Sequence, residues 1–137
     1  MPSFKKQERL HGRTLFANLF AKGKSFHVSP YKITWLFTDL DIHQEDPVQV
    51  AFIVPKRNFK KASDRNRIRR RMKEAYRLHK TTFRLAYINS GKKLVFALYY
   101  SAREEKYYPE IESKIIVTLQ QLEKETRKID PAQTTSA

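Results

Sequence analysis

A strongly basic segment, residues 56–73, limits the possible folds more than any other part of the chain. Ten of its residues are Lys or Arg and only Asp64 is acidic. Apolar residues recur at helical spacing inside and beyond it, which predicts a helix over residues 63–79. The fold must bury one thin side of this helix and leave the basic remainder outside. The narrow apolar stripe consists of Ile68, Met72, Ala75 and Tyr76.

The missing acids indicate what this helix binds. On exposed helices, basic side chains are usually paired with acidic ones four residues away. Here no acidic residue follows Asp64 until Glu74. The whole chain has 28 Lys and Arg against 14 Asp and Glu, a net charge of +14. Such a surface favours nucleic acid through counterion release. A charged face that serves only solubility is the alternative, and a membrane surface is disfavoured because the helix has few bulky apolar anchors.

The remaining patterns predict an α+β fold. Residues 14–22 and 109–127 carry apolar side chains on one helical face. The 137-residue length suits one domain, with helices packed against one mostly antiparallel sheet. We expect this domain over residues 1–128, with a basic arm at 1–12 and a disordered tail at 129–137. Strands are predicted at residues 31–38, 48–54 and 94–100, with 26–28 as a candidate edge strand.

Catalysis by the protein itself finds little support. The chain has no Cys, no phosphate-binding glycine loop and no Gly-x-Ser-x-Gly motif. We therefore expect neither a catalytic residue nor a metal ligand. The four histidines, His11, His27, His43 and His79, are scattered without a metal-binding spacing. An acidic loop with Asp39, Asp41, Glu45 and Asp46 could bind a hard cation, although a solvated acidic loop is the favoured interpretation.

Two absences bear on location. No apolar run approaches the ~20 residues of a membrane helix, and the N-terminus lacks the apolar core of a secretion signal. The lack of Cys is compatible with a reducing compartment. A cytoplasmic location is expected.

The aromatic residues of the first helix allow two interpretations. Phe16 and Phe20 share one face of a short helix beside a sheet. From composition alone, core packing is the favoured interpretation, and a stacking platform for unpaired bases is the functional alternative. Lys32 and Thr34, on the mixed face of the first long strand, could line the same groove.

The basic helix carries a family resemblance. Its sequence SDRNRIRRRMKEAYR closely resembles the signature of the bacterial ribonuclease P protein, in which an Arg-Asn-Arg core precedes a basic run. FKKQERL and LFANLFAKG resemble the basic arm and aromatic helix of that family. VAFIVPKRNFKKA resembles the strand and turn before the signature, and YYPEIESKII resembles the last helix. The resemblance covers about residues 4–122.

The resemblance implies an αβββαβα two-layer sandwich like that of ribosomal proteins, with a left-handed crossover around the signature helix. It implies a ribonucleoprotein in which a catalytic RNA subunit holds Mg²⁺ and performs the hydrolysis. The protein would bind this ribonuclease P RNA and the 5′ leader of precursor tRNA, with neither DNA nor a membrane as a partner. By position, the RNA-subunit contacts would be Arg65, Asn66 and Arg67, supported by Lys56, Arg57, Lys60, Lys61, Arg69 and Arg70. The leader cleft would contain Phe16, Phe20, Lys32 and Thr34.

The chain departs from the family pattern at two positions and leaves one register open. Pro55 stands where a small polar residue is usual, and Ser63 where an apolar residue is common. A shift of one residue in the strand would place Tyr31 and Ile33 toward the leader instead. Two other functions remain as alternatives: a ribosomal or assembly RNA-binding protein without an enzyme, and a self-sufficient protein nuclease.

Overall fold

The predicted element order αβββαβα is confirmed. The computed structural model describes residues 4, 8–10, 13–39, 47–88 and 92–128. None of the helices in these ranges is long and apolar enough to cross a membrane. The elements are α1 (Arg13–Lys22), β1 (Lys24–Val28), β2 (Tyr31–Asp39), β3 (Val48–Ile53), α2 (Ala62–Leu85), β4 (Lys92–Tyr100) and α3 (Tyr108–Arg127).

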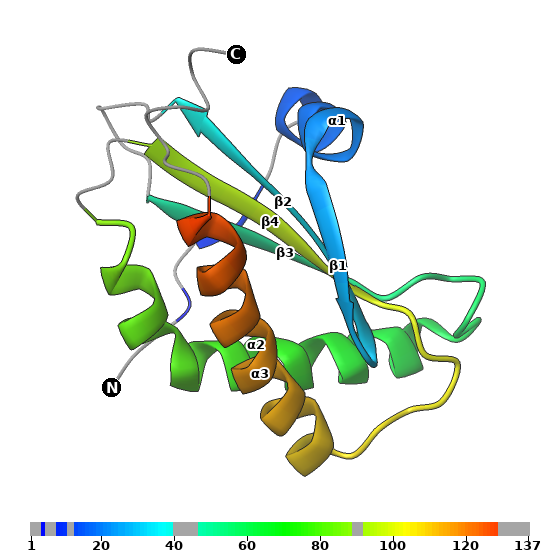
Figure 1. Ribbon diagram of the computed structural model, residues 1–137. Helices are drawn as coiled ribbons and strands as arrows, with labels where there is room; N and C mark the ends of the chain where they lie inside the picture. Colours follow the sequence, from blue (N-terminus) through cyan, green and yellow to red (C-terminus); the bar gives the residue numbers. More distant parts are fainter. Residues whose placement is uncertain (1–3, 5–7, 11–12, 40–46, 89–91, 129–137) are drawn as a thin grey trace.

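The strands form one sheet in the order β1-β2-β4-β3 (Figure 1). β2 pairs antiparallel with both β1 and β4, whereas β3 runs parallel to β4. The candidate edge strand is therefore real, and it begins two residues earlier than predicted, at Lys24. Because β3 and β4 are parallel neighbours joined through α2, the chain makes a crossover between them. Its left-handedness stays a prediction from the family resemblance.

The two faces of the sheet carry different helices. On β4, Leu94, Phe96 and Leu98 belong to the main core, which includes the stripes of α2 and α3. Val95 and Ala97 point to the opposite face and pack with Leu19 of α1. The sheet and the α2–α3 pair thus form the predicted two layers, and α1 covers part of the other face (Figure 1).

Helix α2 is longer than predicted, because it continues from residue 79 to Leu85. Phe83 extends the apolar stripe and is 3% exposed. Lys80 occupies the stripe position between Tyr76 and Phe83, where a charge normally marks a surface. Here its ammonium group lies 2.5 Å from a carboxylate oxygen of Glu8, and both side chains are buried. The N-terminal arm therefore supplies the countercharge that allows a lysine in the core.

The arm also extends the sheet. Arg9 forms a parallel bridge with Val50 of β3, and the Leu10 amide donates to the Val50 carbonyl at 3.0 Å. Leu10 is buried in the same small core as Leu19. Residues 8–10 therefore lie between α1 and α2.

Candidate nucleic-acid interface

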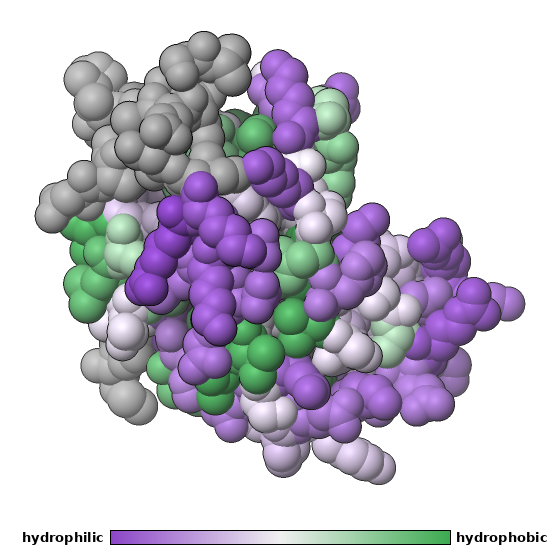
Figure 2. All heavy atoms as spheres, viewed as in Figure 1, coloured by the Kyte–Doolittle hydropathy of each residue, from purple (hydrophilic) through white to green (hydrophobic). Residues whose placement is uncertain are grey.

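The nine predicted RNA-subunit contacts gather around the N-terminal end of α2, toward the right of Figure 1. Figure 2 shows that this end of the molecule is covered mainly by hydrophilic residues. Asn66 and Arg70 are exposed on the helix, whereas Arg65, Arg67 and Arg69 are half-buried. The four basic residues before the helix, Lys56, Arg57, Lys60 and Lys61, are all exposed.

Arg65 stabilises the turn that leads into α2. Its Nη1 atom donates to the carbonyl oxygens of Phe59 and Lys60, each at 2.8 Å. Phe59 is buried and its ring lies 5.8 Å from that of Tyr100. Arg65 therefore fixes the backbone that carries Lys60 and Lys61, in addition to any contact with RNA.

Arg67 is held by two carboxylates. Its Nε and Nη2 atoms donate to the two carboxylate oxygens of Glu105 at 2.6 and 2.8 Å, and Nη2 also donates to Asp64 at 2.7 Å. The hydrogen bond to Arg67 lowers the pKa of Glu105, and the same bond raises the pKa of Arg67. Both groups therefore stay charged at neutral pH, and only Nη1 of Arg67 remains for a phosphate.

Arg71, which was not among the predicted RNA contacts, joins this cluster. Its Nη1 atom donates to Glu105 at 2.8 Å and to the Lys106 carbonyl at 3.0 Å. Glu105 thus lies between two arginines one helical turn apart. The missing acid of the basic helix comes from the loop between β4 and α3, a contact that no pattern local to α2 could reveal.

A groove connects the basic helix with the aromatic helix. It has a volume of about 240 Å³ and is lined by Phe16 of α1 and by Arg69 and Lys73 of α2, with β3 residues and the arm between them. Burial, followed by the nearby charges of Arg9 and Arg69, lowers the pKa of Lys73. The cations therefore repel one another at the edge of an apolar surface. The remaining lining residues are Phe4, Arg9, Leu10, Val50, Ala51, Phe52 and Ile53.

Phe16, which lines this groove, is stacked with a second phenylalanine of α1. The rings of Phe16 and Phe20 are stacked, with centroids 6.3 Å apart and planes inclined by 12°. Phe16 packs partly against the small core, and Phe20 is 54% exposed. Core packing therefore explains part of the surface of Phe16, but it does not explain the exposed ring of Phe20.

The strand register places Lys32 and Thr34 on the α1 side of the sheet. Tyr31 and Ile33 are fully buried in the main core on the opposite face, so they present no surface to a ligand. Lys32 is exposed, but Thr34 is only 7% exposed and its hydroxyl lies 3.0 Å from that of Ser25. Of this predicted pair, Lys32 alone presents a large surface for a ligand.

Sequence reasoning missed one neighbour of Lys32, the tyrosine that faces it on β4. Tyr99 pairs with Lys32 across β2 and β4, and the Arg57 Nη2 atom donates to the Tyr99 hydroxyl at 3.1 Å. Lys32 and Tyr99 lie on different strands, so the sequence could not show that they face each other. That becomes visible only when the pairing of β2 with β4 is known. Arg57 therefore reaches from the basic segment to the open part of the α1-side face.

The described residues contain no group of three His, Asp or Glu side chains close enough to hold a metal ion. His79 lies 3.0 Å from Glu112 as an isolated pair between α2 and α3. His11, His43 and residues 40–46 of the predicted acidic loop lie outside the described residues.

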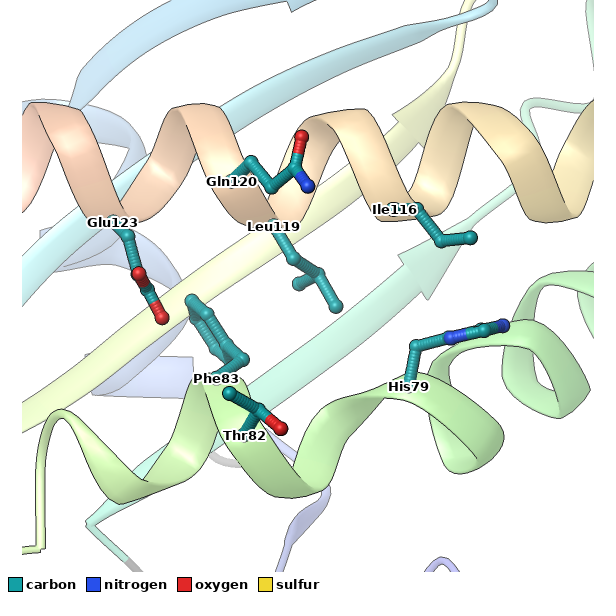
Figure 3. Close-up of a pocket in the computed structure, with 7 residues that line it drawn as sticks. All are labelled: His79, Thr82, Phe83, Ile116, Leu119, Gln120 and Glu123. Carbon is teal, nitrogen blue, oxygen red and sulfur yellow. The ribbon is translucent and has the colours of Figure 1, made fainter.

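A second groove runs between α2 and α3, with a volume of about 380 Å³. Figure 3 shows Leu119 and Glu123 projecting from α3 toward α2, and Phe83 projecting from α2 toward α3. Its lining mixes polar and apolar groups and contains one carboxylate, Glu123, and one imidazole, His79. The other lining residues are Thr82, Phe83, Ile116, Leu119 and Gln120.

The curated proteins with similar sequences include several protein components of ribonuclease P. The protein component of ribonuclease P from Chlorobium phaeobacteroides is 42% identical over 79 residues, which are 57% of this chain and 54% of that protein. The component from Porphyromonas gingivalis is 35% identical over 75 residues, 55% of this chain and 53% of that protein. The chain thus spans about half the length of these curated relatives.

Solved structures support the same fold. The ribonuclease P protein from Thermotoga maritima superposes with a TM-score of 0.63 at 19% identity, covering 83% of this chain and 96% of that one. The Staphylococcus aureus protein gives a TM-score of 0.61 at 17% identity, covering 84% and 94%. The family model described as Ribonuclease P matches residues 4–123. This match includes the arm, the aromatic helix, the basic helix and most of α3, and the chain belongs to the ribonuclease P protein family.

Proposed function

We propose that this chain is the protein subunit of ribonuclease P, and that it binds the catalytic RNA and the 5′ leader of precursor tRNA. In this role it promotes endonucleolytic removal of the leader to give the mature 5′ end. The proposal places the protein in the cytoplasm. It assigns residues 1–128 to the binding domain and residues 129–137, which lie outside the described residues, to a tail.

One observation carries the proposal: a single groove joins Phe16 of α1 to Arg69 and Lys73 of α2. Aromatic rings offer stacking surfaces to unpaired bases, and the cations offer charge to the backbone phosphates. We assign Phe16, Phe20 and Lys32 to the leader, with Thr34 supporting the strand beneath them. The exposed basic end of α2 is assigned to the RNA subunit.

We assign the hydrolysis to the RNA. The described side chains offer no cluster for a metal ion, so in this proposal the RNA holds the catalytic Mg²⁺. The test is reconstitution with the matching RNA and Mg²⁺. The complex should remove the leader at physiological salt, and the protein alone should not. Cleavage by rigorously RNA-free protein would instead identify a protein nuclease, and failure to stimulate the RNA would favour an RNA-binding protein without an enzyme.

The assignment of the basic end is tested most directly with Arg70→Ala. Arg70 is exposed, so its removal should leave the unfolding free energy nearly unchanged. If Arg70 contacts a phosphate, the slope of log affinity against log salt should fall in magnitude by about 0.7–0.9. Filter binding to the RNA subunit between low and physiological salt measures this slope.

Arg127→Ala is the matched control for this measurement. Arg127 has 74% of its side chain exposed at the far end of α3 and carries the same charge. Its loss should change affinity little and leave the slope as it is. Equal effects of the two substitutions would mean that only the net charge of the protein matters.

A further inference from the structure

We infer that Glu105 is a positioning residue of the RNA-binding surface, and that Arg71 is a phosphate ligand which Glu105 orients. This inference rests on the proposed function and adds two residues to it. Neither is part of the Arg-Asn-Arg core. Both lie at the contact between α2 and residues 101–107, the loop that joins β4 to α3.

The geometry of Arg71 carries the inference. Both hydrogens of its Nη1 atom are used, one by Glu105 and one by the Lys106 carbonyl. Its Nε and Nη2 atoms donate to no other group in the described part of the chain, and 26% of the side chain is exposed. These two atoms form the edge with which a guanidinium binds a phosphate through two parallel hydrogen bonds. Arg71 is therefore anchored by one end and open at the other.

Arg67 has the opposite arrangement. Its Nε and Nη2 atoms are occupied by Glu105 and Asp64. Its phosphate-binding edge is therefore filled, although Arg67 belongs to the signature core. Arg67 instead holds Glu105 through both carboxylate oxygens, which fixes the carboxylate that orients Arg71.

The loop that carries Glu105 is itself anchored. The Tyr100 hydroxyl donates to the Glu104 carbonyl at 2.7 Å and accepts from the Lys106 amide at 2.9 Å. Tyr100 is fully buried, so the backbone on both sides of Glu105 is tied to the core. Glu105 thus offers a fixed carboxylate, and Arg71 loses little freedom when a phosphate binds.

Glu105→Gln separates a positioning role from a simple charge effect, because the two predict opposite changes in affinity for the RNA subunit. Removal of an acid near an RNA-binding surface raises the net charge by one and should tighten binding. If Glu105 orients Arg71, its amide replacement turns one acceptor into a donor that faces a guanidinium. Arg71 then loses its orientation, and affinity for the RNA subunit should fall about fivefold, the scale of a weakened charge-assisted hydrogen bond.

Glu104→Gln is the matched control. Glu104 is the adjacent residue, its side chain is 85% exposed, and within the described ranges its carboxylate pairs with Lys106 alone, at 3.6 Å. It gives the same change in charge at nearly the same place without touching Arg67 or Arg71. Binding of both variants and the wild type to the matching RNA subunit, across a salt series, is the experiment. We expect Glu104→Gln to bind as tightly as the wild type or more tightly, and Glu105→Gln to bind more weakly.

Binding of Glu105→Gln that equals or exceeds that of Glu104→Gln would overturn the inference. Wild type that fails to bind the RNA would instead overturn the proposed function. Arg71→Lys covers the case in which Glu105→Gln unfolds, because it keeps the charge and removes the two-point edge. It should weaken binding about fivefold with little change in the salt slope, and wild-type affinity for this variant would refute the role of Arg71.

Discussion

Phe20 is the residue at which packing and recognition can be separated. It leaves more than half of its surface exposed, and its ring stacks on Phe16. An exposed aromatic of this size contributes little to folding, because much of its surface stays in water in the folded state. In the proposed function, this exposed ring extends the stack onto a base of the leader.

We therefore predict that Phe20→Leu keeps the thermal stability and weakens binding of precursor tRNA. Loss of one stacked base should reduce binding by about 1–3 kcal/mol. Mature tRNA, which has no leader, should bind as before, as should the RNA subunit. The measurement is affinity of the reconstituted complex for substrates with leaders of graded length.

Leu85→Ala is the control for Phe20→Leu. Leu85 is 62% exposed on a different helix, so its truncation removes exposed apolar surface away from the groove. It should affect neither substrate. An equal loss for mature and precursor tRNA with Phe20→Leu would rule out leader stacking.

At the scale of the elements, the sequence pattern within each helix and strand correctly predicted which of its faces is buried. The stripes of α2 and α3 and the alternation of β2 and β4 all pointed to the buried faces that the structure has. The features that local patterns did not predict depend on residues far away in the sequence. The predicted helix ended at residue 79 because Lys80 interrupts the apolar pattern. Its partner Glu8 is 72 residues away, so no local pattern indicates that this lysine is buried. Arg67 was predicted as an RNA contact without its partner Glu105, which is 38 residues away.

The ends of α2 and α3 are joined by a buried contact that depends on pH. The Tyr87 hydroxyl lies 2.7 Å from that of Thr126. Burial is the main cause that raises the pKa of Tyr87 to about 12, whereas an unfolded chain has a tyrosine pKa of about 10. The folded state therefore favours the protonated phenol. Its contribution is fully present below pH ~10 and is lost as pH rises toward ~12, at no more than about 1.4 kcal/mol per pH unit.

Tyr87→Phe should consequently flatten the fall in stability between pH 10 and 12. Thr126 keeps a partner in this variant, because its hydroxyl also donates to the Glu123 carbonyl at 3.0 Å. Some slope should remain, since burial also raises the pKa values of Tyr31 and Tyr100. Urea unfolding at several alkaline pH values measures it. Tyr107→Phe, at a residue that is 81% exposed, makes the same chemical change and should leave the slope as in the wild type.

At the scale of the whole molecule, the N-terminal arm links the parts that the proposed function requires. Glu8 is 1% exposed and contacts Lys80, with Arg84 at 3.5 Å. The Lys80 ammonium group also lies 6.0 Å from the ring of Phe4. The buried Glu8 carboxylate thus attaches the arm to α2, while Phe4 and Arg9 line the groove that contains Phe16.

Glu8→Gln tests whether the arm is held in this way. It removes the negative charge that faces Lys80 and Arg84, and breaking a buried pair from one side typically destabilises a protein by about 3–5 kcal/mol. Urea unfolding should show this loss, whereas Glu104→Gln, at an exposed carboxylate, should change stability by no more than about 0.5 kcal/mol. Because the arm lines the groove, Glu8→Gln should also weaken leader-dependent binding at temperatures where the protein stays folded. Full stability together with unchanged leader binding would mean that the arm is positioned by its bridge to β3 and not by the ion pair.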